Sequence, residues 1–187
     1  MVGQVGRLFL AVDLSSEARY ALAARLEATI QGRLPGKVVP PPNWHITLRF
    51  LGDVDQVGRD RLLMELTGAD LGSGFELTLD RLGAFPKEKS ASVLWAGRAG
   101  GEARLDELVG VVEEAVEAAG FKAEERPFHP HLTLSRIRPP QDVTRLIAGT
   151  GDLRVRTCVE AVTLFRSHLG RGTAHYEKLE RFELAIP

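Results

Sequence analysis

The chain contains one short pattern twice, as His45-Ile46-Thr47-Leu48 and again as His131-Leu132-Thr133-Leu134. In a β-strand, successive side chains point to opposite faces, so each histidine shares a face with its threonine. The intervening isoleucine and leucine side chains point the other way. Both segments are therefore predicted to be strands with one polar face and one face buried in a hydrophobic core.

Two histidines that share a site can supply an acid and a base at the same pH. The unperturbed pKa of histidine lies near neutrality, so one imidazole can be charged while the other is neutral. The threonine hydroxyl two residues from each histidine can donate a hydrogen bond to an anionic oxygen between them. A phosphate undergoing in-line displacement suits this arrangement, because its attacking and leaving oxygens lie on opposite sides. We therefore predict that His45, Thr47, His131 and Thr133 form a catalytic site.

These motifs and their flanks resemble the two-histidine phosphoesterases, and within them the RNA 2′,3′-cyclic phosphodiesterases, also called 2′-5′ RNA ligases. The matching segments are Arg7–Asp13, Asn43–Leu48 followed by Phe50-Leu51-Gly52, Gly83–Pro86, and His129–Arg136. The resemblance implies metal-independent, cofactor-free hydrolysis of a terminal 2′,3′-cyclic phosphate of RNA to a 2′-phosphate, and reversible 2′-5′ ligation. It also implies that His45 is the proton donor and His131 the proton acceptor.

Other functions remain open at this level. The substrate could be a small cyclic nucleotide or a 2′-5′-linked oligonucleotide, and the protein could instead be a non-catalytic module that binds RNA ends. A zinc site is a further alternative, because His129 and His131 share a strand face and could bind zinc together with His45. Pro130 disfavours regular pairing there and zinc would not explain the recurring threonines, so we expect no metal.

Two arginines are candidates for binding the phosphate. Arg49 continues the alternation of the first motif and would point into the same groove if the strand stays regular. Arg136 lacks the parity of the second motif, although the resemblance implies an arginine shortly after it. Only a strand end or a bulge near Ser135 would turn Arg136 toward the groove. The aromatic candidates for stacking against a terminal base are Phe9, Trp44, Phe128 and Tyr176.

The remaining pattern predicts an α+β fold. Helices are expected over 17–31, 56–66, 102–119 and 142–147, and further strands over 8–12, 75–79, 92–95, 154–165 and 174–184. After each motif the order is the same, helix, long strand (75–85 or 153–166), turn and final strand, which indicates an internal repeat. We therefore predict a single bilobal domain over 1–187. Its two pseudo-symmetric, intertwined lobes would line a central cleft with antiparallel sheets and carry their helices outside.

Composition restricts the kind of protein. The 187 residues carry a net charge of −1, whereas a protein that coats nucleic acid uses many Lys and Arg contacts to phosphates. We therefore expect an RNA 3′ end or a cyclic nucleotide as the partner, with no obligate protein partner. No apolar run approaches the ~20 residues that cross a bilayer, and no leader is recognisable, so we expect a cytoplasmic protein without membrane contact. The single Cys158 is expected to be a buried strand residue.

Overall fold

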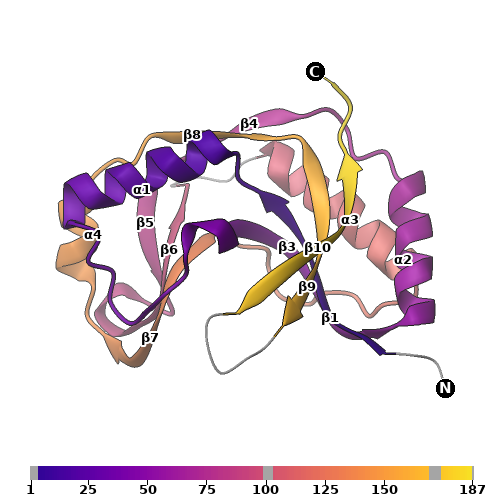
Figure 1. Ribbon diagram of the computed structural model, residues 1–187, viewed down its shortest axis with the longest axis horizontal. Coiled ribbons are helices and arrows are strands. Elements are labelled where there is room, and N and C mark those ends of the chain that lie inside the picture. Colours follow the sequence, from indigo (N-terminus) through magenta and orange to yellow (C-terminus); the bar gives the residue numbers. More distant parts are fainter. Residues whose placement is uncertain (1–3, 99–102, 169–173, 187) are drawn as a thin grey trace.

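The computed structural model describes residues 4–98, 103–168 and 174–186 (Figure 1). In chain order the elements are β1 (Gln4–Asp13), α1 (Ser16–Ile30), β2 (Lys37–Val38), the 3₁₀ turn η1 (Pro41–Asn43), β3 (His45–Asp55), α2 (Gln56–Gly68), β4 (Phe75–Leu79), β5 (Arg81–Phe85), the 3₁₀ turn η2 (Glu88–Ser90), β6 (Ala91–Gly97), α3 (Ala103–Ala118), β7 (Leu132–Gln141), α4 (Thr144–Thr150), β8 (Val155–Val159), β9 (Ala161–His168) and β10 (His175–Glu183). The predicted helices all occur within a few residues of their expected ranges. Residue 102, the expected start of the third, lies outside the described residues.

The strands form one large sheet and one small one. The eight-stranded sheet has the order β10-β9-β1-β3-β7-β6-β5, with β2 beside β7, and all its pairs are antiparallel. The two-stranded sheet pairs β4 with β8. In Figure 1, α1 and α4 lie near β5 at one end, and α2 and α3 lie at the other end, near β1 and β3. The predicted α+β class with antiparallel sheets and outer helices is confirmed.

The two halves of the chain exchange strands. Strand β7 belongs to the second half, yet its neighbours β2, β3 and β6 all come from the first half. Conversely, β1 from the first half pairs with β9 from the second. Since each half depends on strands of the other, we propose that both halves fold together as one domain.

Both predicted long strands are interrupted. The chain breaks at Asp80, between β4 and β5, and at Glu160, between β8 and β9. At each break it leaves the small sheet for the large one, because β4 and β8 pair with each other while β5 and β9 join the large sheet. The amide of Leu153 donates a 2.7 Å hydrogen bond to the carbonyl of Asp80, which links the two halves at the first break. The repeated order of helix, strands and final strand is therefore confirmed, with one more strand in each copy than expected. The turn before the final strand of the second copy lies outside the described residues.

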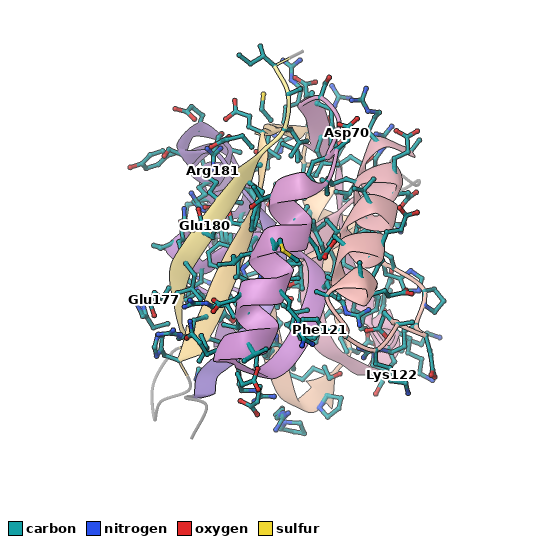
Figure 2. The ribbon with its side chains drawn as sticks, turned by 90° about the vertical axis from the view of Figure 1, so that its right-hand side faces the viewer. Asp70, Phe121, Lys122, Glu177, Glu180 and Arg181 are labelled. Atoms are coloured by element: carbon teal, nitrogen blue, oxygen red, sulfur yellow. The ribbon has the colours of Figure 1, made fainter. Side chains whose placement is uncertain are left out.

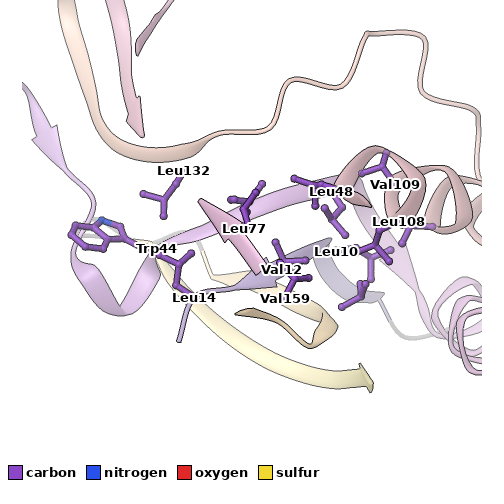
Figure 3. Packing of buried hydrophobic residues seen from close by; sticks show 14 of the residues in the cluster. Leu10, Val12, Leu14, Trp44, Leu48, Leu77, Leu108, Val109, Leu132 and Val159 are labelled. Carbon is purple, nitrogen blue, oxygen red and sulfur yellow. The ribbon is translucent and has the colours of Figure 1, made fainter. Parts of the chain in front are cut away.

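The main core lies between the large sheet, the helices and the small sheet. Figure 3 shows side chains of this core from β1, β3, β4, β8 and α3 packed together, among them Leu10, Leu48, Leu77 and Val159. Helix α3 contributes the apolar face expected from its sequence, Leu105, Leu108, Val109, Val112 and Val116, all of them buried. Helices α2 and α3 lie side by side in Figure 2. This packing covers the apolar face of the motif strands, which Ile46, Leu48, Leu132 and Leu134 form.

The prediction that Cys158 is buried is wrong. Cys158 lies in a strand as expected, but its side chain is exposed. Strand β8 alternates, so that Val155, Thr157 and Val159 face the core while Arg156 and Cys158 face solvent.

None of the helices in the described residues is long and apolar enough to span a membrane.

Candidate active site

The two motifs fold alike. Over 45–50 and over 131–136 the burial pattern is the same: half-buried, buried, half-buried, buried, buried, exposed. The histidines and threonines occupy the half-buried positions, and the intervening isoleucine and leucines are in the core, as predicted. The two consecutive buried positions show that the simple alternation breaks after each threonine.

A β-bulge follows the threonine in each motif. In the first, Thr47 pairs with Ala11 and Arg49 with Leu10, so one residue of β3 has no partner on β1. In the second, Thr133 pairs with Trp95 and the next paired residue of β7 is Ser135. An extra residue in one strand reverses the face of every side chain after it. The residues beyond each bulge therefore point opposite to the prediction from a regular strand.

The motif strands are direct neighbours. Ile46 of β3 pairs with Leu132 of β7 in antiparallel register. This register places His45 opposite Thr133 and Thr47 opposite His131, with all four side chains on one face. In agreement, Thr47 and His131 line one cavity of about 510 Å³. Each histidine thus lies beside the threonine of the other motif, and the structure brings all four predicted residues together.

Both imidazoles are held in the same orientation. The Nδ1 of His45 lies 2.8 Å from the carbonyl oxygen of Asn43, and the Nδ1 of His131 lies 2.7 Å from that of His129. A carbonyl oxygen only accepts, so each Nδ1 carries the hydrogen and donates it. In the neutral ring the lone pair is then on Nε2, the nitrogen that faces away from the backbone. Each histidine is thereby set to exchange a proton through Nε2.

The charges near the two histidines differ. Burial lowers the pKa of His45 to about 4, against the hydrogen bond to Asn43 and the negative charge of Asp13, which raise it. Burial also lowers the pKa of His131, against the hydrogen bond to the His129 carbonyl, which raises it, and the charges of Arg136 and His129 lower it further. Asp13 pairs directly with His45 across β1 and β3. The carboxylate of Asp13, which also binds Arg19 and Lys178, favours the charged form of His45, whereas His131 and Arg136 favour its neutral form.

Arg136 lies on the same side as the histidines. The bulge at the second motif gives Arg136 the parity of Thr133, which is the condition that the sequence required. Its side chain is exposed, and its positive charge lowers the pKa of both His45 and His131. Arg136 is therefore placed to contact an anion between the two histidines.

Strand β3 is not regular at Arg49, although a regular strand was the condition for Arg49 to point into the groove. The bulge turns Arg49 toward α3, where its Nη1 lies 2.5 Å from a carboxylate oxygen of Glu113. Its Nη2 donates to the carbonyl oxygen of Lys122, just beyond α3, and the side chain is buried. Arg49 also lines the cavity, but its charge is already paired with that of Glu113.

The zinc alternative is not supported by the geometry. Across residues 4–98, 103–168 and 174–186, no three His, Cys, Asp or Glu side chains are grouped so that they could hold a metal ion. His45, His129 and His131 are all within these ranges and form no such group. His129 contributes its backbone carbonyl to His131 instead.

The aromatic candidates divide into two groups. Phe9 and Trp44 are buried, so neither offers a face to a base; Phe9 packs beneath His45 with ring centroids 5.0 Å apart. Tyr176 and Phe128 remain half-buried and accessible. The Tyr176 ring meets His45 edge to face at 5.1 Å.

Three residues near the site were not identified as functional from the sequence. Phe85 packs edge to face on His131 at 5.0 Å, Asp13 pairs with His45, and Phe50 lines the cavity. Phe50 could have been found from the repeat, because it follows His45 at the same spacing as Arg136 follows His131. Asp13 and Phe85 come from other strands, so only the pairing of the sheet reveals them.

The fold and this arrangement define a phosphoesterase with two histidines, and comparison with known proteins agrees. The LigT-like phosphoesterase family model matches residues 12–95 and 99–176, and the chain belongs to that family. It is 33% identical over 178 residues to the RNA 2′,3′-cyclic phosphodiesterase of Escherichia coli K12, covering 95% of this chain and 96% of that protein. It is also 33% identical over 156 residues to the protein of the same name from Aeropyrum pernix, covering 81% and 88%.

Solved structures give the same result. The crystal structure of E. coli LigT complexed with 3′-AMP has a TM-score of 0.77 and 28% identity, covering 97% of this chain and 99% of that chain. The complex of E. coli LigT with phosphate has a TM-score of 0.73 and 26% identity, covering 98% and 99%. E. coli LigT, a protein of this fold, therefore binds a nucleotide and a phosphate.

Proposed function

We propose that this protein is an RNA 2′,3′-cyclic phosphodiesterase that acts on RNA 3′ ends. The observation that carries the proposal is the pair of equivalent imidazoles, each oriented by a backbone carbonyl and each beside the threonine of the other motif. The names of relatives that cover most of the chain support the same activity. Phosphate and 3′-AMP, bound to the similar E. coli LigT, belong to the same ligand class.

In the proposed mechanism His131 is the base and His45 is the acid. Neutral His131 accepts a proton through Nε2 from a water molecule, whose oxygen forms a bond to phosphorus. The bond from phosphorus to the ribose 3′ oxygen breaks, and charged His45 donates its proton to that oxygen. The product is a 2′-phosphate with a free 3′ hydroxyl. Thr47, Thr133 and Arg136 bind the phosphoryl oxygens and stabilise the charge of the transition state.

The negative charge of Asp13 supports the assignment of His45 as the acid, against burial, which lowers the pKa of this ring. An acid must be charged before it donates, and Asp13 favours the charged form of His45. Arg136 favours the neutral form of both rings, and at His131 the charge of His129 adds to this effect, which suits a base. A bound phosphate anion would raise the pKa of His45 from its value of about 4 in the empty groove, because an opposite charge favours the imidazolium.

Turnover of a defined substrate tests the function. A dinucleotide that ends in a 2′,3′-cyclic phosphate is expected to be converted to the 2′-phosphate at the same rate with and without a strong chelator. Hydrolysis to a 3′-phosphate would contradict the proposed direction of ring opening. Binding without turnover would indicate a non-catalytic RNA-end module instead, and hydrolysis restricted to mononucleotides would indicate the alternative of a small cyclic nucleotide as substrate.

The two arginines are expected to respond differently to substitution. Arg136→Met should weaken binding of a 2′-phosphate nucleotide by about 10- to 100-fold, the contribution of a hydrogen bond between charged groups. Arg49→Met should instead lower the free energy of unfolding by about 1–3 kcal/mol, because it leaves Glu113 and the Lys122 carbonyl without their partner. Calorimetric titration and urea unfolding of both variants measure the two effects. An unchanged affinity in Arg136→Met would remove it from the phosphate site.

The pKa of His45 predicts a loss of stability in acid. Its pKa is about 4 in the folded protein and 6.5 in the unfolded chain. Between pH 6.5 and about 4 the unfolded state therefore binds a proton at His45 that the native state does not bind. The free energy of unfolding should therefore fall between pH 6.5 and about 4, by at most about 3 kcal/mol, and by less if solvent screens this half-buried ring.

His45→Gln removes this titration. Urea unfolding at pH 7.5 and pH 4.5 should show that His45→Gln loses less stability in acid than the wild type does. Equal losses in the two proteins would mean that the ring of His45 accepts a proton freely in the native state.

A further inference from the structure

The cavity that contains the catalytic groups extends well beyond them. One end is lined by Thr47 and His131, and the same cavity of about 510 Å³ continues to Phe50, Val109 and Phe128. We name this second part the outer groove. A volume of this size is typical of pockets that enclose a whole small molecule, whereas a phosphate alone needs only the inner end. The outer groove is therefore large enough for another chemical group of the substrate.

The outer groove presents an aromatic face to solvent. All eight phenylalanines lie within the described residues, and Phe50 alone is exposed, with 59% of its surface accessible. The bulge at the first motif places Phe50 on the groove side, opposite Phe9, with ring centroids 5.9 Å apart. Phe128, from the segment before the second motif, is half-buried and lines the same cavity. Such accessible rings are the platforms on which nucleobases stack.

The charged side chains of the outer groove cancel one another. Arg49 pairs with Glu113 at 2.5 Å. The guanidinium of Arg126 pairs with both carboxylate oxygens of Glu124, at 3.0 and 2.9 Å. Two arginines and two glutamates leave no net charge to attract a second phosphate. A wall with aromatic rings, whose charged side chains are paired with one another, suits a base rather than another part of the RNA backbone.

The distance of Phe50 from the catalytic residues bears on which base of the substrate it contacts. Phe50 is three residues further along β3 than Thr47, which at about 3.3 Å per residue is up to about 10 Å from the catalytic end. In an RNA end, the terminal base is joined to the cyclic phosphate through one ribose. The preceding base is joined through that ribose, its 5′ phosphate and a second ribose, so it can lie further from the cyclic phosphate, at the distance of Phe50.

We propose that the outer groove binds the base of the second nucleotide, the one preceding the nucleotide that carries the cyclic phosphate. The inference rests on the proposed function and deepens it, because it makes an oligonucleotide end, rather than a cyclic mononucleotide, the better substrate. Phe50 stacks against this base, and Phe128 and Val109 complete the apolar surface around it.

The test compares two substrates that end in the same group. Cytidine 2′,3′-cyclic monophosphate has only the terminal nucleotide, and a dinucleotide ending in cytidine 2′,3′-cyclic phosphate adds the second base. The wild type is expected to have a kcat/KM for the dinucleotide about 5- to 100-fold above that for the mononucleotide, the factor given by stacking one base on an aromatic ring. Phe50→Ser should reduce this ratio toward one, and Phe50→Trp, which keeps an aromatic face, should retain it.

Tyr20→Ser is the matched control, because Tyr20 is an exposed aromatic residue on α1, at 79% accessibility, and is not among the residues that line this cavity. It should leave the ratio at the wild-type value. A wild type that hydrolyses both substrates with equal kcat/KM would overturn the inference and leave the proposed function intact. An equal loss on both substrates in Phe50→Ser would overturn it by assigning Phe50 to the terminal base. Failure of the wild type to hydrolyse either substrate would overturn the proposed function as well.

Discussion

Replacing either motif histidine by alanine is expected to reduce the turnover of a 2′,3′-cyclic phosphate by about two to four orders of magnitude. This is the usual contribution of a positioned acid or base to a proton transfer. His45→Ala removes the proton for the leaving 3′ oxygen, and His131→Ala removes the group that deprotonates water. Single-turnover kinetics with a cyclic-phosphate dinucleotide measure the loss in the reaction step itself.

Both variants are expected to remain folded. The two rings lie on the groove face, and the core face of the motif strands is formed by Ile46 and Leu132, which the substitutions leave in place. His168→Ala is a suitable control, because His168 is an exposed histidine at the end of β9 that binds Glu177. It should keep wild-type turnover. A folded His45→Ala or His131→Ala variant with near-wild-type activity would disprove the two-histidine mechanism.

The second large effect concerns which histidine donates the proton. When the 3′ oxygen of the substrate is replaced by sulfur, the leaving group is a thiolate. A thiol has a pKa near ~8.5, far below that of an alcohol. Such a leaving group departs without an acid, whereas the attacking water still needs a base. His45→Ala is therefore expected to recover most of its lost rate, roughly 10²- to 10⁴-fold, on the 3′-thio cyclic substrate, and His131→Ala is not.

The outcome separates three mechanisms. Rescue of His131→Ala instead of His45→Ala would reverse the assignment and would mean that Asp13 does not determine which ring is charged. Rescue of neither variant would show that the histidines act by stabilising charge on the phosphate rather than by proton transfer. The wild type on both substrates is the reference, since it reports the change in reactivity caused by sulfur alone.

The local sequence predicted the elements that depend on short-range pattern. The alternation within each motif predicted two strands with histidine and threonine on one face, and the structure has both strands, although His131 lies immediately before β7 rather than in it. The apolar spacing of α3 predicted its buried face correctly, because a helix repeats within a few residues whatever lies around it. The repeated motif was sufficient to indicate the family, which the comparisons confirm.

The positions beyond each motif depend on the neighbouring strand. A bulge forms where the register of two strands shifts, so the partners on β1 and β6 determine it as much as β3 and β7 do. For this reason the sequence alone placed Arg49 in the groove and left Arg136 undecided. In the structure Arg49 turns to Glu113 on α3, and Arg136 turns to the histidines.

The sequence by itself thus predicted the motif strands, the helices and the four residues of the paired motifs, since these follow from periods of two and 3.6 residues. It predicted neither β2 nor the breaks at Asp80 and Glu160. The tertiary structure decided how the parts combine. Only the pairing of Ile46 with Leu132 sets each histidine beside the threonine of the other motif. Only the pairing of β1 with β3 brings Asp13 to His45, and the bulge in this pairing leaves Phe50 exposed. These contacts join residues far apart in the chain, and no local pattern specifies them because their energy depends on both partners.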